Sequence, residues 1–262
     1  MTTVMPTHQD QASPYYYMAH SQQVVKHQSL CKNSNNQDSK VMAKHLKTMS
    51  KASRNRVRSY FDTIKDSEIE SQSDYWSTRN PDTHQEVKNR WLFAFASVHT
   101  TWTNNVNQYE QVKDKPLCNY SRLLSRLIIG GGGMYNLKAQ GMFHFGCTWR
   151  YDHTKFTNKP ENWVQARNSI AKELIQLNKA KTSFAYEMTW PLETQVVCLD
   201  RHILRLYGQD PEKAPNQTNY DWMENYWVKL SKERQVPPYI ARCIYWDRIN
   251  NSTTSNYWAY IL

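Results

Sequence analysis

Hydrophobic residues recur at intervals of three or four along most of the chain. Trp91, Leu92 and Phe95, for example, are spaced so that one face of a helix would carry all three. No alternation of apolar and polar residues is long enough for a strand, so the pattern predicts an all-α protein with many short helices. We expect helices near residues 57–64, 86–98, 101–112, 123–128, 135–145, 161–177, 181–188, 200–207, 220–230 and 238–249.

Proline and glycine mark several of the expected breaks between helices. Asn80-Pro81-Asp82 is typical of a turn, and Trp190-Pro191 interrupts the apolar pattern. Four of the seven glycines stand together from Gly130 to Gly133. A helix cannot continue through this run, because each glycine costs about 1 kcal/mol relative to alanine. Pro160 precedes one expected helix and Gly208 follows another. Proline is favoured at the start of a helix and glycine just after its end.

Residues 1 to 50 differ in character from the rest of the chain. They are rich in Gln, Asn, Ser, His and Lys and show no sustained apolar period, so we interpret them as a basic, mostly disordered tail. Seven Lys or Arg and no acidic residue lie between Lys40 and Arg58, many of them three or four apart. This run is either an arm that binds phosphates or a solvated basic linker, and we favour the arm.

The charge balance suggests a class of partner. The chain of 262 residues has 33 Lys and Arg against 23 Asp and Glu, a formal net charge of +10. An acidic polymer such as nucleic acid is the partner that this balance favours. On charge alone, an unspecialised basic surface explains the balance equally well.

Several protein classes do not fit the sequence. The longest largely apolar run, residues 91–98, is far shorter than the ~20 residues of a membrane-spanning helix, and the first twenty residues contain no apolar signal segment. Five cysteines are scattered along the chain without a Cys-x-x-Cys pair, which favours reduced thiols over disulfides or a zinc site. We therefore expect an intracellular protein without a membrane partner or a metal, in the cytoplasm, the nucleoid or an infected host cell.

Four segments with recognisable patterns follow one another along the chain. Residues 95–107 place a Thr-rich turn between an apolar helix and a helix with a Val-Asn pair, and residues 132–140 contain Gly-hydrophobic-aromatic-x-x-Lys-Ala. Residues 177–182 end in Lys-Thr, and residues 197–205 contain Asp-x-His-x-x-Arg. Over roughly residues 90 to 250, the four segments in this order resemble the endonuclease III-like DNA glycosylases of the helix-hairpin-helix–GPD superfamily.

This resemblance implies a two-part, all-α fold with a cleft between the parts. A six-helix module with the hairpin is expected at residues 90–190, and residues 51–89 and 191–262 are expected to form the second part, with Asp200 at the interface. The implied activity is that of a DNA N-glycosylase, which removes a flipped modified or mismatched base from double-stranded DNA in base excision repair. The implied partner is duplex DNA, bound by a monomer.

The chain departs from the superfamily pattern at two places. Asn178-Lys179-Ala180 stands where relatives have Gly-Val-Gly, whose backbone N–H groups approach a DNA phosphate; Lys179 could supply charge instead. Many relatives hold an iron–sulfur cluster with four closely spaced cysteines after the catalytic helix, where only Cys198 and Cys243 are available here. We therefore expect no cluster and no other cofactor.

The resemblance assigns catalytic roles to two residues. Asp200 matches the carboxylate that stabilises positive charge on the sugar while the glycosidic bond breaks. As an aspartate in front of an apolar helix it is also expected to be an N-cap, which leaves its second oxygen free. Lys181 matches the lysine of bifunctional members, which attacks C1′ and forms a Schiff base before strand cleavage, the AP-lyase activity. A merely exposed lysine at a helix start is the alternative for Lys181.

Further positions in the four segments are expected to contact DNA. His99 stands where relatives use Gln to fill the gap left by a flipped base, and His202 gives polar support around the catalytic helix. Trp102, Trp149 and Trp190 lie near helix breaks and are candidates for stacking on an everted base. The expected DNA-contacting residues are His99, Asn104, Lys138, Lys179, Thr182, His202 and Arg205.

Two alternative functions stay open at this point. Some phage members of the superfamily modify thymine side groups in DNA without excising the base, and the hairpin without glycines, the missing cysteines and the Asn-, Gln- and Tyr-rich composition are compatible with such an enzyme. A catalytically silent DNA-binding relative is the second alternative, although the presence of both Lys181 and Asp200 counts against it. Release of a free base distinguishes the glycosylase from either alternative.

Overall fold

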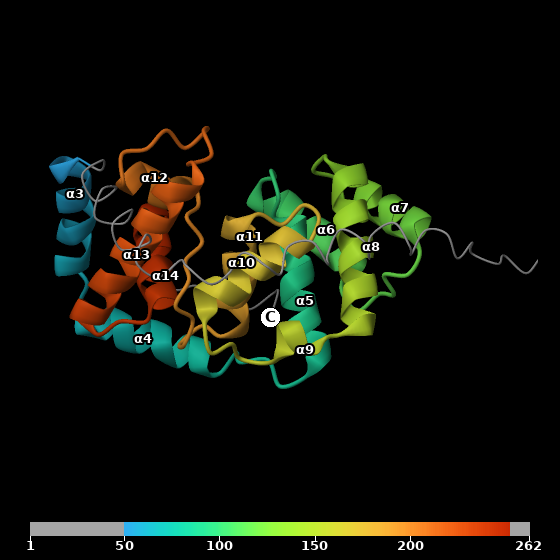
Figure 1. Ribbon diagram of the computed structural model, residues 1–262, viewed down its shortest axis with the longest axis horizontal. Helices are drawn as coiled ribbons and strands as arrows, with labels where there is room; N and C mark the ends of the chain where they lie inside the picture. Colours follow the sequence, from blue (N-terminus) through green and yellow to red (C-terminus); the bar gives the residue numbers. More distant parts are fainter. Residues whose placement is uncertain (1–49, 252–262) are drawn as a thin grey trace, which may run out of the picture. The chain divides into compact units, whose positions relative to one another are not determined.

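The computed structural model of the protein describes residues 50–251, and every regular element in this range is a helix. The prediction of an all-α fold is therefore confirmed. Residues 1–49 of the expected tail, with the basic positions up to Lys47, lie outside the described residues. The helices of Figure 1 are α3 (Lys51–Asp62), α4 (Asp66–Ser77), α5 (His84–Ala96), α6 (Trp102–Val112), α7 (Tyr120–Gly130), α8 (Tyr135–Tyr151), α9 (Thr154–Thr157), α10 (Trp163–Glu173), α11 (Lys179–Thr189), α12 (Arg201–Leu206), α13 (Gln217–Arg234) and α14 (Pro238–Ile249).

Most of these helices begin where the sequence supplies a short polar side chain. The side-chain oxygen of Thr83 accepts a hydrogen bond from the backbone N–H of Glu86 at the start of α5, and Asn178 accepts one from Lys181 at the start of α11. Such bonds satisfy N–H groups of the first turn that have no partner within the helix. The other N-caps of this kind are Ser50, Thr101, Asn119, Asn162, Asp200 and Asn216, at the starts of α3, α6, α7, α10, α12 and α13.

The helices pack in two groups (Figure 1). In the first group α5 contacts α6, α8, α9 and α11, while α7 contacts both α6 and α8, and α10 packs on α11. In the second group α13 contacts α3 and α14, α14 contacts α4, and α12 contacts α3. The second group therefore combines the earliest described helices with the latest ones. The expected boundary between residues 89 and 90 falls inside α5, whereas the one between 190 and 191 follows the end of α11.

Helix α5 forms the centre of the first group. The six consecutive residues from Trp91 to Ala96 are fully buried, because four neighbouring helices pack against α5. The Trp91 ring packs edge-on against Phe156 and Tyr186, with ring centroids 4.9 and 5.6 Å apart. Helix α11 is buried along most of its length as well. These two helices therefore hold the turns at their ends in fixed positions.

Helix α3 is attached to the second group by an aromatic contact and by a guanidinium group. The Phe61 ring packs edge-on against Trp227 of α13 at a centroid distance of 4.9 Å. Arg56 donates hydrogen bonds to the carbonyl oxygens of Leu206 and Tyr207 at the end of α12, where carbonyl groups lack partners within the helix. Arg56 belongs to the basic run, so part of this run helps to hold the helices of the second group together.

Helix α4 was not predicted from the hydrophobic pattern. Only Gln72 and Trp76 are buried in it, so its sequence shows too few apolar positions for a visible period. Asp66 and Glu68 in its first turn favour a helix N-terminus, because the helix dipole is positive there. Gln72 donates a hydrogen bond to Asp247 of α14, which replaces part of the missing apolar contact.

A buried ion pair joins the two groups of helices. Arg167 of α10 donates two hydrogen bonds to the carboxylate of Glu224 on α13, at 2.8 and 2.7 Å. Both side chains are at most 2% exposed. Glu224 also accepts a hydrogen bond from the backbone N–H of Val197. The pair therefore holds the segment that leads into α12 against both groups.

Candidate active site

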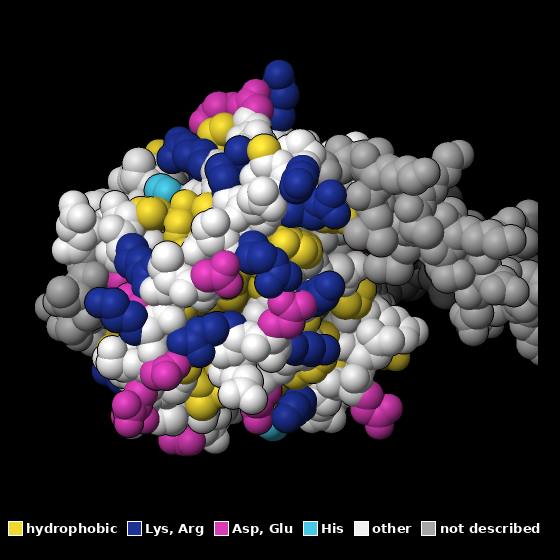
Figure 2. All heavy atoms as spheres, turned by 90° about the vertical axis from the view of Figure 1, so that its left-hand side faces the viewer, with side chains coloured by type: hydrophobic (Ala, Val, Ile, Leu, Met, Phe, Trp, Pro, Cys, Tyr) yellow, Lys and Arg dark blue, Asp and Glu magenta, His cyan; other side chains and the backbone are white. Residues whose placement is uncertain are grey.

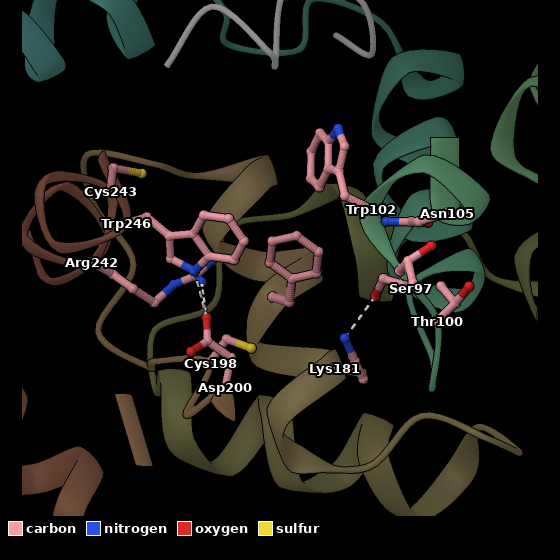
Figure 3. A pocket seen from close by; sticks show the side chains of 12 residues that line it. Ser97, Thr100, Trp102, Asn105, Lys181, Cys198, Asp200, Arg242, Cys243 and Trp246 are labelled. Carbon is pink, nitrogen blue, oxygen red and sulfur yellow. Dashed lines mark hydrogen bonds and ion pairs between the residues drawn. The ribbon is translucent and has the colours of Figure 1, made fainter. Parts of the chain in front are cut away.

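A cavity of about 150 Å³ is lined by residues from both groups of helices (Figure 3). Its walls come from the turn between α5 and α6, the first half of α11, the segment in front of α12, and α14. Lys181 and Asp200, the two residues predicted to be catalytic, both line this cavity. The fold therefore brings together two side chains that are 19 positions apart in the sequence.

Asp200 is the N-cap of α12, but neither of its carboxylate oxygens is free. Oδ1 accepts hydrogen bonds from the backbone N–H groups of His202 and Ile203, at 2.9 and 3.0 Å. Oδ2 accepts from Arg242 Nη1 and Trp246 Nε1, both at 2.9 Å, so the expectation of a free second oxygen is wrong. Burial opposes ionisation, but Arg242 and Trp246 outweigh it and lower the pKa of Asp200 below its usual value. The carboxylate is thus kept anionic beside the cavity.

Arg242 is shared between Asp200 and a second carboxylate, that of Glu187 on α11. Nη2 of Arg242 lies 2.9 Å from Glu187 Oε2, and its Nε donates to Oε1 at 3.1 Å. Glu187 is fully buried and also accepts a hydrogen bond from the backbone N–H of Cys198. Burial raises the pKa of Glu187 to about 7, against the opposite effect of Arg242. These contacts connect α11, the segment before α12, and α14.

The ammonium group of Lys181 is held at the other side of the cavity. Its Nζ donates a hydrogen bond of 2.9 Å to Ser97 Oγ, and Ser97 in turn donates to the carbonyl oxygen of Ala94 at 2.7 Å. Burial lowers the pKa of Lys181, although Asp200 acts in the opposite direction. A lowered pKa increases the neutral fraction of the amine at a given pH, and a nucleophilic lysine reacts in its neutral form.

Aromatic rings form much of the remaining wall. Trp102, Phe184 and Trp246 all line the cavity, and Figure 3 shows the indole groups of Trp102 and Trp246 on separate sides of it. Trp149 and Trp190, the other two candidates for stacking on a base, pack against aromatic residues elsewhere in the core. Of the three expected stacking residues, Trp102 is therefore the one at the cavity.

The arrangement of helices is similar to that of solved proteins. The 8-oxoguanine glycosylase/lyase of Methanocaldococcus jannaschii, solved in complex with a 15mer DNA containing 8-oxoguanine, matches with a TM-score of 0.60 and 17% sequence identity, over 77% of this chain and 99% of that one. The 8-oxoguanine DNA glycosylase of Thermotoga maritima matches with a TM-score of 0.58 and 14% identity, over 82% of this chain and 100% of that one. The chain has the fold of the 8-oxoguanine DNA glycosylases. The expected glycosylase-like fold is therefore confirmed, while comparison of the sequence with protein-family profiles and with curated proteins finds no match.

The turn between α10 and α11 contains the residues in which the hairpin was expected from the sequence. Gln176 has a positive φ of 71° in this turn, a conformation that glycine adopts more easily. Lys179 lies 2.5 Å from Asp221 of α13, so a phosphate contact would require it to leave this ion pair. Thr182 is fully buried and its hydroxyl donates to the carbonyl oxygen of Asn178. In this structure Thr182 is part of the helix start, and its expected contact with DNA stays a prediction.

Lys138 is buried between helices and donates hydrogen bonds to two of them. It is 1% exposed, and its Nζ donates to the carbonyl oxygen of Ala96 at 2.8 Å and to Gln108 Oε1 at 2.6 Å. Burial lowers the pKa of Lys138 to about 8. In this structure the side chain joins α8 to the end of α5 and to α6, and its expected contact with DNA stays a prediction.

The remaining expected DNA-contacting residues are accessible. His99 is exposed in the turn between α5 and α6, with a φ of 45°. Asn104 is half-buried against the glycine run, since a Cβ on Gly132 would lie 2.8 Å from the Cβ of Asn104. His202 is half-buried and Arg205 is exposed on α12. Their contacts with DNA stay predictions.

Several residues of the cavity were not assigned a role from the sequence, among them Ser97, Asn105, Phe184 and Arg242. Ser97 and Asn105 belong to the segment at residues 95–107, but nothing in their spacing indicates that they face a cavity. Phe184 is one of several apolar residues of α11. Arg242 follows Asp200 by 42 residues, so no local spacing could have identified this pair.

The face formed by the second group of helices carries charges of both signs. Figure 2 shows Lys and Arg side chains interspersed with Asp and Glu on this face. Some of them form exposed ion pairs, such as Arg58 with Glu233 and Arg201 with Glu212. The net positive charge of the chain is therefore not gathered into one basic stripe on this face.

Within residues 50–251, no helix combines the length and the apolar character needed to cross a membrane. The same range contains no cluster of three or more His, Cys, Asp or Glu side chains arranged to hold a metal ion. The four cysteines in this range are free thiols, of which Cys198 and Cys243 are buried beside the cavity.

Proposed function

We propose that the protein is a DNA glycosylase, which removes a base that has been flipped out of duplex DNA into the cavity. The observation that carries this proposal is the presence, in one cavity, of an anionic carboxylate, Asp200, and a lysine with a lowered pKa, Lys181. Breaking an N-glycosidic bond builds positive charge on the sugar, and a fixed carboxylate stabilises it. The shared fold with 8-oxoguanine DNA glycosylases supports the proposal.

In this mechanism Asp200 acts as a fixed negative charge. Its two oxygens accept four hydrogen bonds, so it could take up a proton only by giving up one of them. Arg242 and Trp246 also fix the plane of the carboxylate, which keeps its position constant while charge develops on the sugar. Stabilisation by a preorganised charge of this kind needs no rearrangement at the moment of reaction.

Lys181 supplies the nucleophile in the version of the reaction that includes AP-lyase activity. The lone pair of the neutral amine forms a bond to C1′, and the electron pair of the glycosidic bond leaves with the base, which takes up a proton. The nitrogen then loses a proton, and its lone pair forms the C1′=N bond while the C1′–O4′ bond breaks. The electron pair of that bond stays on O4′, which takes up a proton. The resulting Schiff base permits cleavage of the strand. In a monofunctional enzyme, water attacks C1′ in place of the amine.

We infer that the partner is double-stranded DNA, bound by one copy of the chain. The similar enzyme from Methanocaldococcus jannaschii was solved with DNA that contains 8-oxoguanine, which supports DNA binding and makes this base the first to test. The exposed His99 lies in the turn that also contributes Thr100 and Thr101 to the cavity, which supports a role for His99 in filling the gap that a flipped base leaves.

The experiment is a base-release assay on duplexes with 8-oxoguanine, uracil, hypoxanthine or a mismatch, combined with borohydride trapping. We expect release of a free base from at least one duplex, and a covalent adduct with DNA that Lys181→Gln abolishes if the enzyme is bifunctional. Release without any adduct would assign the monofunctional reaction. Binding of duplex DNA without release of any base would overturn the proposal in favour of a thymine-modifying or silent relative.

A further inference from the structure

Glu187 is a buried carboxylate with no role in the reaction described for Asp200 and Lys181. It lies on α11 and is fully buried. Oε1 accepts hydrogen bonds from the backbone N–H of Cys198 and from Arg242 Nε, at 3.0 and 3.1 Å. Oε2 lies 2.9 Å from Arg242 Nη2 without a well-aligned hydrogen bond. A buried ion pair is often no more stable than well-packed apolar residues, so stability alone does not explain this carboxylate.

The guanidinium group of Arg242 is divided between two carboxylates. Its Nε and Nη2 face Glu187, whereas its Nη1 donates to Asp200 Oδ2. The ring centroids of Phe184 and Tyr239 lie 5.2 and 5.3 Å from its Cζ and restrict its movement. The Asp200 side chain is 20% exposed and that of Glu187 is 0% exposed, so Asp200 is the carboxylate on the cavity side.

The net charge of this cluster depends on the proton of Glu187. With both carboxylates ionised, their two negative charges exceed the single positive charge of Arg242 by one. With Glu187 protonated, the guanidinium faces Asp200 alone and the two charges cancel. Buried charges are weakly screened, so this difference reaches the cavity, where Figure 3 shows Asp200 on the other side from Lys181. An excess of negative charge stabilises a positive sugar better than a neutral pair does.

Glu187 is the carboxylate of the cluster that changes charge near neutral pH. Burial raises its pKa to about 7. The pKa of Asp200 lies below its usual value, so that carboxylate stays anionic. Burial raises the pKa of the Cys198 and Cys243 thiols to about 12, so both stay neutral at this pH. Shifted pKa values of this kind are frequent at functional sites.

The other charged groups around Glu187 act on it less directly than Arg242 does. Lys181, on the same helix, interacts with it electrostatically. Arg90 of α5 donates to backbone carbonyl oxygens, and Arg167 of α10 is bound in its own buried ion pair. Among the residues that the structure describes, Arg242 is therefore the cation in direct contact with Glu187.

We propose that Glu187 is a positioning residue that, when ionised, binds Arg242 and thereby leaves the charge of Asp200 only partly neutralised toward the sugar. This inference rests on the proposed glycosylase function and adds a regulation by pH to it. When Glu187 is protonated, Arg242 neutralises Asp200, and the sugar cation is stabilised less. Base release should therefore increase as Glu187 loses its proton.

Glu187→Gln keeps the shape of the side chain and removes its charge. Glu224→Gln is the matched control, because Glu224 is also buried, paired with an arginine and bound to a backbone N–H of the segment before α12. Urea unfolding identifies conditions in which both variants are folded. Above the titration of Glu187, we expect Glu187→Gln to lower the single-turnover rate of base release roughly 10-fold, less than the ~10²–10³-fold cost of losing a direct contact to the transition state. Glu224→Gln should keep the wild-type rate.

Binding and pH dependence provide two readouts that a loss of structure does not reproduce. Both variants should bind a duplex with a tetrahydrofuran abasic-site analogue as tightly as the wild-type protein, because both side chains are buried away from DNA. The wild-type rate should rise with a midpoint near pH 7. Glu187→Gln should lack this step and Glu224→Gln should retain it. Borohydride trapping locates the separate titration of Lys181.

If Glu187→Gln does not fold, Glu187→Asp keeps the charge, and its pH profile should retain the step. A wild-type rate without a step near pH 7 would overturn the inference whichever variant folds. A folded Glu187→Gln protein with the wild-type rate would overturn it too, and would leave the glycosylase function standing. Equal losses in Glu187→Gln and Glu224→Gln would reduce Glu187 to a structural residue. A wild-type protein that binds the abasic duplex but releases no base from any duplex would overturn the glycosylase function, and this inference with it.

Discussion

Arg242 Nη1 donates a hydrogen bond of 2.9 Å to Asp200 Oδ2, and the same guanidinium group holds Glu187 by two further contacts. The Asp200 side chain is 20% exposed, whereas that of Glu187 is fully buried. One arginine therefore stands between a carboxylate at the cavity and a carboxylate inside the protein. The position of Asp200 depends in this way on α14 and α11 as well as on its own helix.

Asp200→Asn keeps the shape of the side chain and removes its charge. We expect base release to fall by at least about 100-fold, since each 1.36 kcal/mol of lost transition-state stabilisation is tenfold in rate, while affinity for duplex DNA stays near normal. Loss of the charged bond to Arg242 should also lower the free energy of unfolding by about 1–3 kcal/mol. Single-turnover kinetics and urea unfolding measure the two effects, with the exposed Asp74→Asn as control. A folded Asp200→Asn protein with unaltered base release would contradict the catalytic role.

Ser97→Ala removes the hydroxyl that accepts the hydrogen bond from Lys181. An acceptor stabilises the charged ammonium more than the neutral amine, so its loss should lower the already lowered pKa of Lys181 further. The rate of borohydride trapping rises as Lys181 loses its proton. Its pH midpoint should therefore lie below the usual lysine value in the wild-type protein and lower still in Ser97→Ala. A midpoint that stays in place or moves up would show that this bond does not control the amine.

Glu187→Gln tests the effect of burial on the carboxylate behind the cavity. Burial raises the pKa of Glu187 to about 7 in the folded protein, so the unfolded chain loses this proton first as the pH rises. Between about pH 4.5 and pH 7 the unfolded state then binds fewer protons, and this group makes the wild-type protein less stable as the pH rises. The stability of the wild-type protein minus that of Glu187→Gln should therefore decrease across this window in urea titrations. An increase would mean that Arg242 dominates and holds the pKa below its usual value.

The buried pair of Arg167 and Glu224 allows a matched comparison on one helix. Glu224→Gln leaves the guanidinium of Arg167 buried without its counter-charge, and we expect a loss of about 3–5 kcal/mol in the free energy of unfolding. Glu233 lies on the same helix α13 and forms an exposed ion pair with Arg58 of α3. Glu233→Gln breaks this pair and should lower the free energy of unfolding by less than about 1 kcal/mol. Chemical denaturation of both variants measures the difference. Equal losses would contradict the structural importance of the buried pair.

The basic tail is tested by deleting residues 1–49. The deletion stops before Ser50, because α3 contributes the buried side chains of Val57 and Phe61 and has to be retained. If the run from Lys40 binds phosphates, the shortened chain should bind duplex DNA more weakly, and its affinity should depend less steeply on salt. Binding titrations at several salt concentrations give the slope. An unchanged slope would identify the run as a linker.

The sequence predicted helices well where apolar spacing and helix ends agreed. The expected helix at residues 238–249 has the observed bounds of α14. Helix α8 instead continues past Phe145 to Tyr151, although glycine disfavours a helix. Gly146 is tolerated there because Leu117 packs so closely that a Cβ would lie 2.5 Å from the Cβ of Leu117. Such tertiary contacts are not visible in local spacing.

The candidate site could be predicted only in part, for a similar reason. Asp200 and Lys181 were found because they belong to recognisable segments, whereas Arg242 and Ser97 are near them only in the folded chain. Lys138 lies in a recognisable segment too, yet its side chain points inward. Neighbouring helices can cover several sides of one helix. A motif therefore identifies the residue types in that helix, but it does not show which side of the helix is left to face DNA.

The attachment of α3 to the last helices also has a consequence for synthesis. The buried faces of Val57 and Phe61 stay without cover until α12 and α13 have left the ribosome. The helices from α5 to α11 find their neighbours within a shorter stretch of chain, which favours their early assembly. A nascent chain that ends before α14 would contain Lys181 but neither Arg242 nor Trp246. The arrangement around Asp200 is therefore complete only after α14 has been made, and under the proposed function unfinished chains should release no base from DNA.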